Sequence, residues 1–333
     1  MGFSDGCMGP YATNENVTID EDFMTHNEEG SVLVYDVGGS HIAAAVCHAG
    51  HYGLSPVVST PHPAEETSEA FVRALHELGV KASAGLAPVA GAELAFPGPF
   101  DYATGVSWMK HKLPFLYGLD LRGELAARFG WQPAQVRFLK DSDAFLLGEI
   151  GGGAARGVAR AVGITLGTGI GSAFAVDGRV VSDGAGVPPG GEIWNLPYEG
   201  GIIEDSVSTR GIRAAYERRT GVASQVVDLA KAAATDPAAA EAFAEFGHHL
   251  GRALHGALAA FAPQVIVLGG GISRSPHLFL PAAQRELDGL NTEFRVSALL
   301  DDAPLVGAGV AWFNGVNAAS RQAIADDAQI TAN

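Results

Sequence analysis

Cysteine is scarce in this chain. Only two cysteines, Cys7 and Cys47, occur among the 333 residues. That number excludes a disulfide framework and a zinc cluster built from cysteines. A protein without disulfides fits a reducing compartment, and we expect the cytoplasm.

Positive charge is also in short supply, because 21 lysines and arginines face 37 aspartates and glutamates. The resulting net charge of −16 argues against a nucleic-acid partner and against binding to an anionic membrane surface. The sequence has no uninterrupted apolar run of roughly 18 residues, so we expect no membrane span. The early stretch NENVTIDEDF is acidic and polar, unlike the basic and then apolar order of a signal peptide.

The chain does have enough length for two domains. Residues 1–30 lack apolar periodicity and are expected to form a flexible arm, and residues 316–333 a polar tail. Between them we expect a smaller α/β lobe over residues 31–140 and a larger α/β lobe over residues 141–303. The small-residue stretch at 304–315 predicts a helix that packs back on the first lobe.

Glycines and a hydroxyl group interrupt the apolar stretch SVLVYDVGGSHIAAAVC at residues 31–47. The pattern predicts two strands joined by a turn at Gly38, Gly39 and Ser40, with Asp36 just before the turn. An ordinary hairpin turn would explain these residues. A phosphate-binding turn, in which backbone N–H groups approach an anion, would explain them equally well.

The same order of strand, glycine turn and strand recurs in ARAVGITLGTGIGSAFAVDGRVV, at residues 159–181. Gly167, Thr168 and Gly169 form the second turn, and a strand is predicted to follow it. A dinucleotide-binding fold needs a helix at that place, so the pattern disfavours such a fold. Two copies of this order, each followed by helices, indicate two similar α/β lobes with a cleft between them.

Three consecutive polar residues, Asp141, Ser142 and Asp143, stand where a predicted strand enters a helix. Helix capping would explain one such residue, because a carboxylate or hydroxyl at a helix start accepts free N–H groups. A carboxylate at the carboxyl end of a parallel strand also lies where α/β folds bind ligands. Asp141 is therefore a candidate general base.

Two further stretches carry groups suited to ligand binding. In residues 190–211, Glu192, Asn195 and Glu204 could bind vicinal hydroxyls, and Trp194 could stack on a ring. An ordinary surface loop with incidental acidic residues would also explain this stretch. The glycines at 269–271 end a predicted buried strand, either for packing or to let a nucleobase approach the backbone.

Taken together, these stretches resemble the ROK family of sugar kinases and sugar-responsive repressors, within the actin-like hexokinase superfamily. The resemblance covers residues 31–315. DVGGS and GITLGTGIGSA resemble the family's two phosphate motifs, and PQVIVLGGGIS resembles its adenosine motif. FPGPFD matches the P-G-P stretch, and KDSDAFLLGE resembles the stretch with the catalytic aspartate, which falls on Asp141. GGEIWN and GGIIEDSVS resemble the stretches G-E-I-G-H and G-C-x-E-x-x-x-S, with Glu192, Glu204 and Ser208 kept.

The resemblance implies a two-lobed actin-like α/β fold of the ribonuclease H type, with a central cleft. It also implies ATP- and Mg²⁺-dependent phosphorylation of a hexose, with glucose at its 6-position as the first expectation, and a homodimer. Asp141 would be the general base, and Asp36 would hold Mg²⁺ through water. The residues expected at the sugar are Glu192, Glu204, Asn195, Pro97, Gly98 and Lys140. Those expected at the nucleotide are Asp36, Gly38, Gly39, Ser40, Gly167, Thr168, Gly169, Gly270 and Gly271.

The chain also departs from the family pattern. Lys140 and Asp143 replace two asparagines, Asn195 replaces the histidine of G-E-I-G-H, and SWMKHKLPFLYG lacks the asparagine that relatives use near the sugar. The cysteines that bind zinc in many relatives are absent, and Ile202 stands in the place of one of them. We therefore expect no structural zinc, and we expect apolar packing to order this loop instead.

Three alternatives stay open. A sugar-sensing repressor would need a DNA-binding helix-turn-helix, for which the 30 leading residues are too few and too acidic. A catalytically silent sugar-binding module would not need Asp141 or both phosphate turns. A kinase with another substrate would use an N-acetylated amino sugar, fructose, or polyphosphate as donor.

Overall fold

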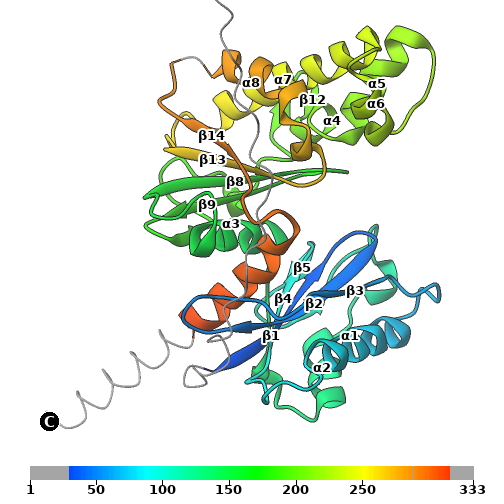
Figure 1. The fold of residues 1–333 in the computed structure, drawn as a ribbon, viewed down its shortest axis with the longest axis vertical. Helices are drawn as coiled ribbons and strands as arrows, with labels where there is room; N and C mark the ends of the chain where they lie inside the picture. Colours follow the sequence, from blue (N-terminus) through cyan, green and yellow to red (C-terminus); the bar gives the residue numbers. More distant parts are fainter. Residues whose placement is uncertain (1–29, 288, 316–333) are drawn as a thin grey trace, which may run out of the picture.

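The computed structural model describes residues 30–287 and 289–315, so the expected N-terminal arm and polar tail lie outside the described part of the chain. These residues form two α/β lobes, one above the other in Figure 1. Each lobe is built on a five-stranded mixed sheet. The predicted fold class, a two-lobed α/β architecture, is confirmed.

The sheet of the first lobe has the strand order β3-β2-β1-β4-β7. β1 pairs antiparallel with β2 and parallel with β4, which in turn pairs parallel with β7. The five strands are β1 (Ser31–Val37), β2 (His41–His48), β3 (Val58–Pro61), β4 (Ala92–Phe96) and β7 (Val136–Lys140). Val37 pairs with Ile42, so the glycine turn at 38–40 joins β1 and β2 as predicted.

The sheet of the second lobe repeats this plan in the order β10-β9-β8-β13-β14. β8 pairs antiparallel with β9 and parallel with β13, which pairs parallel with β14. The strands are β8 (Arg160–Leu166), β9 (Ile170–Val176), β10 (Arg179–Val181), β13 (Val265–Gly269) and β14 (Glu293–Val296). The same strand order and directions in both sheets confirm the internal duplication inferred from the sequence.

Helices cover these sheets, and their ends follow the local sequence. Thr67 caps α1, because its hydroxyl accepts the N–H of Ala70 at 3.2 Å. Gly130 ends α2 at a φ of 69°, a left-handed conformation that suits glycine. The helices are α1 (Ser68–Ala82), α2 (Leu121–Phe129), α3 (Asp141–Gly152), α4 (Ile203–Ser206), α5 (Thr209–Thr220), α6 (Val226–Ala232), α7 (Pro237–Leu258) and α8 (Leu280–Glu286).

Two short antiparallel pairs lie outside the main sheets. One consists of β5 (Phe100–Asp101) and β6 (Val106–Ser107), and the other of β11 (Pro197–Tyr198) and β12 (Gly201–Ile202). The second pair forms a hairpin in a stretch that we expected to be a loop. The hairpin leads directly into α4, which begins at Ile203.

A helix over residues 303–315 lies between the two lobes (Figure 1, red). Leu305, Ala308 and Trp312 on this helix pack in one apolar cluster with residues of β1 and β2. On its other side the helix meets α3 very closely. A Cβ at Gly307 would overlap the carbonyl oxygen of Ala144, so only glycine permits this backbone contact.

The described helices include none with the length and apolar character needed to cross a membrane.

Candidate active site

A cavity of about 510 Å³ opens between the two lobes. Asp36 contributes to its lining from the end of β1, and Asp141 from the start of α3. Thr165 and Gly270 line it from the second lobe, and Asp301 from the turn before helix 303–315. The duplicated topology therefore brings acidic side chains of both lobes to one cavity, at the carboxyl ends of parallel strands.

Asp36 is held in an environment that disfavours a negative charge. Burial and, to a smaller extent, the nearby carboxylates of Asp141 and Asp301 together raise its pKa to about 7. The carboxylates of Asp141 and Asp301 therefore repel that of Asp36, and a bound cation would relieve this repulsion.

Asp141 is the first residue of α3, directly after β7. Its Oδ1 accepts a hydrogen bond from the backbone N–H of Ser142 at 2.7 Å. Burial raises the pKa of this carboxyl, and the Lys112 ammonium group is the largest opposing influence. Asp141 combines exposure to the cavity with a raised pKa, as a general base requires.

The two glycine turns leave room for a ligand. In the first turn Gly39 and Ser40 are exposed, and a Cβ at Gly39 would meet no heavy atom within 4 Å. The turn is closed by a hydrogen bond from the Gly38 N–H to the carbonyl oxygen of His41, 3.0 Å long. In the second turn the Gly167 N–H donates to the carbonyl oxygen of Gly169 at 2.9 Å, and Thr168 is exposed.

Gly270 and Gly271, which follow β13, differ in the space around them. Gly270 has a φ of 81°, and a Cβ there would overlap backbone atoms of Leu166. A Cβ at Gly271 would meet nothing within 4 Å. Gly270 is therefore needed for the fold, whereas Gly271 offers open backbone.

Lys140 has protein partners in this structure. Its Nζ lies 3.3 Å from Oδ1 of Asp143 and donates to the carbonyl oxygen of Gly190 at 3.2 Å. The pKa of Asp143 is raised to about 6, because the effect of burial exceeds the opposing effect of Lys140. Lys140 therefore links the end of β7 to the loop that leads to Glu192, and its expected place at the sugar stays a prediction.

The expected sugar-binding acids are also tied to their surroundings. Glu192 Oε2 accepts a hydrogen bond from the indole N–H of Trp194 at 2.8 Å. Glu204 Oε2 accepts the backbone N–H of Ile170 at 3.3 Å, next to the second glycine turn. Asn195 is exposed. Glu204 thus contacts the turn expected to bind phosphate, a proximity that sequence reasoning did not indicate.

Tyr102 is a neighbour of the site that sequence reasoning missed. Its hydroxyl donates to the carbonyl oxygen of Phe96 at 3.1 Å, beside Pro97 and Gly98. Burial raises the pKa of Tyr102, and the carboxylates of Asp141, Asp143 and Glu192 raise it further. Tyr102 is far from all three acids in sequence, so no local pattern indicated that it lies near them. Asp301 was likewise missed, as one of several acids in an exposed turn.

The acidic groups of the cavity suit a hard cation such as Mg²⁺, which prefers oxygen ligands and keeps several waters. Among residues 30–287 and 289–315, no three histidine, cysteine or carboxylate side chains lie close enough to hold a metal on their own. Mg²⁺ would therefore need oxygens from water and from a bound phosphate besides those of Asp36.

Known proteins resemble this chain over nearly all of its described length. The sequence model of the ROK family matches residues 32–314. The chain is 30% identical to the glucokinase of Thermotoga maritima over 278 residues, covering 73% of this chain and 85% of the relative. It is 28% identical to the N-acetyl-D-glucosamine kinase of Vibrio parahaemolyticus, covering 72% and 83% of the two chains.

A solved structure, the ROK hexokinase of Thermus thermophilus, superimposes with a TM-score of 0.70 at 28% identity. The superposition covers 84% of this chain and 97% of the hexokinase. With the family match over almost the whole described chain, and the actin-like two-lobed fold around an acidic cavity, this protein belongs to the ROK family.

Proposed function

We propose that this protein is a sugar kinase that transfers the γ-phosphoryl group of ATP to a hexose, with glucose and its 6-hydroxyl as the first choice. The observation that supports the proposal most strongly is the position of Asp141, which faces the cavity between the lobes with a raised pKa. A silent sugar-binding protein would not require this arrangement. The similarity to a glucokinase supports glucose as the acceptor.

In this proposal Asp141 accepts the proton of the acceptor hydroxyl as the sugar oxygen attacks the γ-phosphorus. The bond between that phosphorus and the oxygen of the leaving ADP breaks, so charge and atoms balance. Lys112 and the N–H of Ser142 favour the ionised form of Asp141 and thus offset part of the effect of burial. Closure of the lobes would exclude water, a competing acceptor.

In this proposal the two substrates bind to different groups of residues. Glu192, Glu204, Asn195 and Lys140 would contact sugar hydroxyls, beside Pro97 and Gly98. The two glycine turns and the glycines after β13 would bind the nucleotide through backbone N–H groups. Mg²⁺, held by Asp36 through water, would neutralise phosphate charge when bound. The expected homodimer and cytoplasmic location remain predictions.

The test is an assay of ADP release with ATP and a panel of sugars: glucose, mannose, fructose, N-acetylglucosamine and N-acetylmannosamine. Polyphosphate replaces ATP in a second series, where the sugar phosphate is measured instead. We expect turnover with glucose, and loss of turnover in Asp141→Asn with sugar binding retained. Absence of turnover with every sugar and both donors would refute the proposal, and turnover with an N-acetylated sugar alone would move it to that substrate.

A further inference from the structure

The hairpin of β11 and β12 connects the two acids that we place at the sugar. Glu192 precedes the hairpin by five residues, and Glu204 follows it by two. The hairpin is short, since only Pro197 with Ile202 and Tyr198 with Gly201 are paired. Two residue pairs are marginal on their own, so contacts elsewhere must fix the hairpin in place.

The turn of this hairpin is conformationally unfavourable. Glu199 has a φ of 45° and Gly200 a φ of 83°, so both turn residues are left-handed. Two-residue hairpin turns of this kind favour Asn-Gly or Gly-Gly, and a glutamate is unusual at the first position. Such a conformation persists where the surroundings hold it, and it often marks a functional constraint.

Helix α7 provides the contacts that hold the turn. The Tyr198 hydroxyl shares a hydrogen bond of 2.9 Å with Nδ1 of His249, and the two rings meet edge to face with centroids 5.8 Å apart. Oε2 of Glu199 lies 3.5 Å from the same Nδ1, and its Oε1 lies 3.7 Å from Nη1 of Arg252. Tyr198 and Glu199, two adjacent residues of the hairpin, therefore contact two residues about one helical turn apart on α7.

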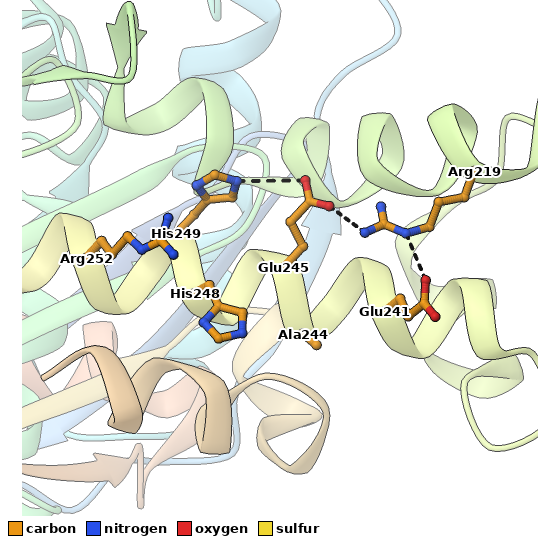
Figure 2. A pocket seen from close by; sticks show the side chains of 7 residues that line it. All are labelled: Arg219, Glu241, Ala244, Glu245, His248, His249 and Arg252. Carbon is orange, nitrogen blue, oxygen red and sulfur yellow. Dashed lines mark hydrogen bonds and ion pairs between the residues drawn. The ribbon is translucent and has the colours of Figure 1, made fainter. Parts of the chain in front are cut away.

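Figure 2 shows how His249 and Arg252 are presented on α7. Nε2 of His249 lies 3.8 Å from Oε1 of Glu245, and Oε2 of Glu245 accepts a hydrogen bond from Arg219 at 2.6 Å. Glu241, one turn earlier, contacts Arg219 at 3.2 Å, and together with Glu245 and His249 it lines a pocket along α7. His249 is thus held on one side by α7 and α5, and on the other side it contacts the hairpin.

The other end of the hairpin is joined by hydrogen bonds to both acids. The N–H of Ile203 donates to the carbonyl oxygen of Leu196 at 3.1 Å, and that of Glu204 donates to the carbonyl oxygen of Trp194 at 3.0 Å. The indole of Trp194 in turn donates to Glu192. A shift of the hairpin relative to α7 would therefore move Glu192 and Glu204 together.

From this continuous set of contacts we propose that Tyr198, Glu199 and His249 are positioning residues: they anchor the hairpin to α7 and thereby place Glu192 and Glu204 at the sugar. The inference rests on the proposed function for the identity of the ligand. The sequence led us to expect that apolar packing alone orders this loop. In this inference, polar contacts with α7 order it. Apolar packing contributes as well, because Leu196 and Tyr198 pack against the core of the second lobe.

Glu199→Gly separates positioning from general stability. Glycine removes the carboxylate but relieves the left-handed backbone, so the melting temperature should not fall. We expect the KM for the hexose to rise on the order of tenfold, because displacements of about 1 Å at a site can cost a hundredfold. The KM for ATP should stay unchanged. Tyr198→Phe should raise the KM for the hexose in the same direction.

Glu241→Gln is the matched control, since Glu241 lines the same pocket without contacting the hairpin. Its kinetic constants should equal those of the wild type. An unchanged KM for the hexose in both Glu199→Gly and Tyr198→Phe, in an enzyme with normal wild-type turnover, would overturn the inference.

Hydrogen exchange gives a readout that does not depend on catalysis. Glu199→Gly should speed exchange at the amides of residues 193–206, while α7 should exchange as in the wild type. Equal exchange over 193–206 in the two proteins would overturn the inference even if no hexose is turned over. Absent turnover in the wild type, by contrast, counts only against the proposed function.

Discussion

Replacing Arg137 by methionine should destabilise the first lobe strongly. The guanidinium Nε lies 2.8 Å from Oε2 of Glu93, whose side chain is only 3% exposed. Arg137 also donates to the carbonyl oxygen of Ala311 at 3.1 Å and lies 4.5 Å from the Trp312 ring, so it fastens helix 303–315 to the sheet. Removing one partner of a buried ion pair costs about 3–5 kcal/mol, because the other charge is left unpaired.

The loss should depend on pH, because Glu93 titrates near neutrality. Burial raises its pKa from 4.5 to about 7, and the charge of Arg137 opposes that rise. The folded protein thus binds this proton more tightly than the unfolded chain. The stabilisation that comes from binding this proton is complete below pH 4.5 and is lost as the pH rises to about 7. Arg137→Met raises the pKa of Glu93 further, so the variant should be weakest at pH 8 and should recover part of the loss near pH 5.5.

Urea unfolding at pH 8 and pH 5.5 measures the difference, with melting temperatures as a second readout. Glu93→Gln combined with Arg137→Met is the control, because it removes the buried charge along with its partner. That double variant should lose less stability at pH 8 than Arg137→Met alone. A loss below about 1 kcal/mol for the single variant, or an equal loss at both pH values, would refute the reasoning.

Three shorter predictions concern the cavity. Asp141→Asn should lower kcat by roughly 10²–10⁴. As the pH is lowered, the kcat of the wild type should begin to fall at a higher pH than an ordinary aspartate would give, because burial raises the pKa of Asp141. A pH profile of kcat that is flat down to pH 4 would contradict the assignment. Gly38→Val should weaken nucleotide binding in calorimetry without unfolding the protein, because the added Cβ would meet only His41, at 3.5 Å; unchanged affinity would count against the phosphate-binding role. A zinc-selective chelator should leave activity intact when Mg²⁺ is in excess, and elemental analysis should find far less than one zinc per chain; zinc lost together with activity would show that the loop is misassigned.

Local patterns predicted the elements that hold the site. The apolar runs before Gly38 and Gly167 gave the strands β1 and β8, and the glycine turns followed each of them. Asp141 was placed at a strand-to-helix junction from sequence alone, and the structure has it as the first residue of α3. Each of these features is determined by residues close together in the sequence. The periodicity of apolar residues and the turn-forming residues are therefore enough to predict them.

The contacts that the sequence could not predict are those between distant segments. Nothing near Glu204 indicates its hydrogen bond with Ile170, and nothing near Tyr198 indicates the contact with His249. The hairpin itself was missed, because its turn uses a glutamate where the usual signal is asparagine or glycine. Such contacts arise when the two sheets and α7 have assembled, and one sequence does not encode them locally.

The close crossing of α3 with helix 303–315 has a mechanical consequence. α3 packs on the second sheet and helix 303–315 on the first, so this crossing is a backbone contact between the lobes. Backbone atoms in direct contact leave no compressible space between the two helices, so a displacement of one helix is transmitted to the other. If the lobes swing against each other, this crossing is the pivot, and displacement grows with distance from it. Asp141, at the first turn of α3, would then travel little, while the exposed Ser40 turn would sweep through a wider arc.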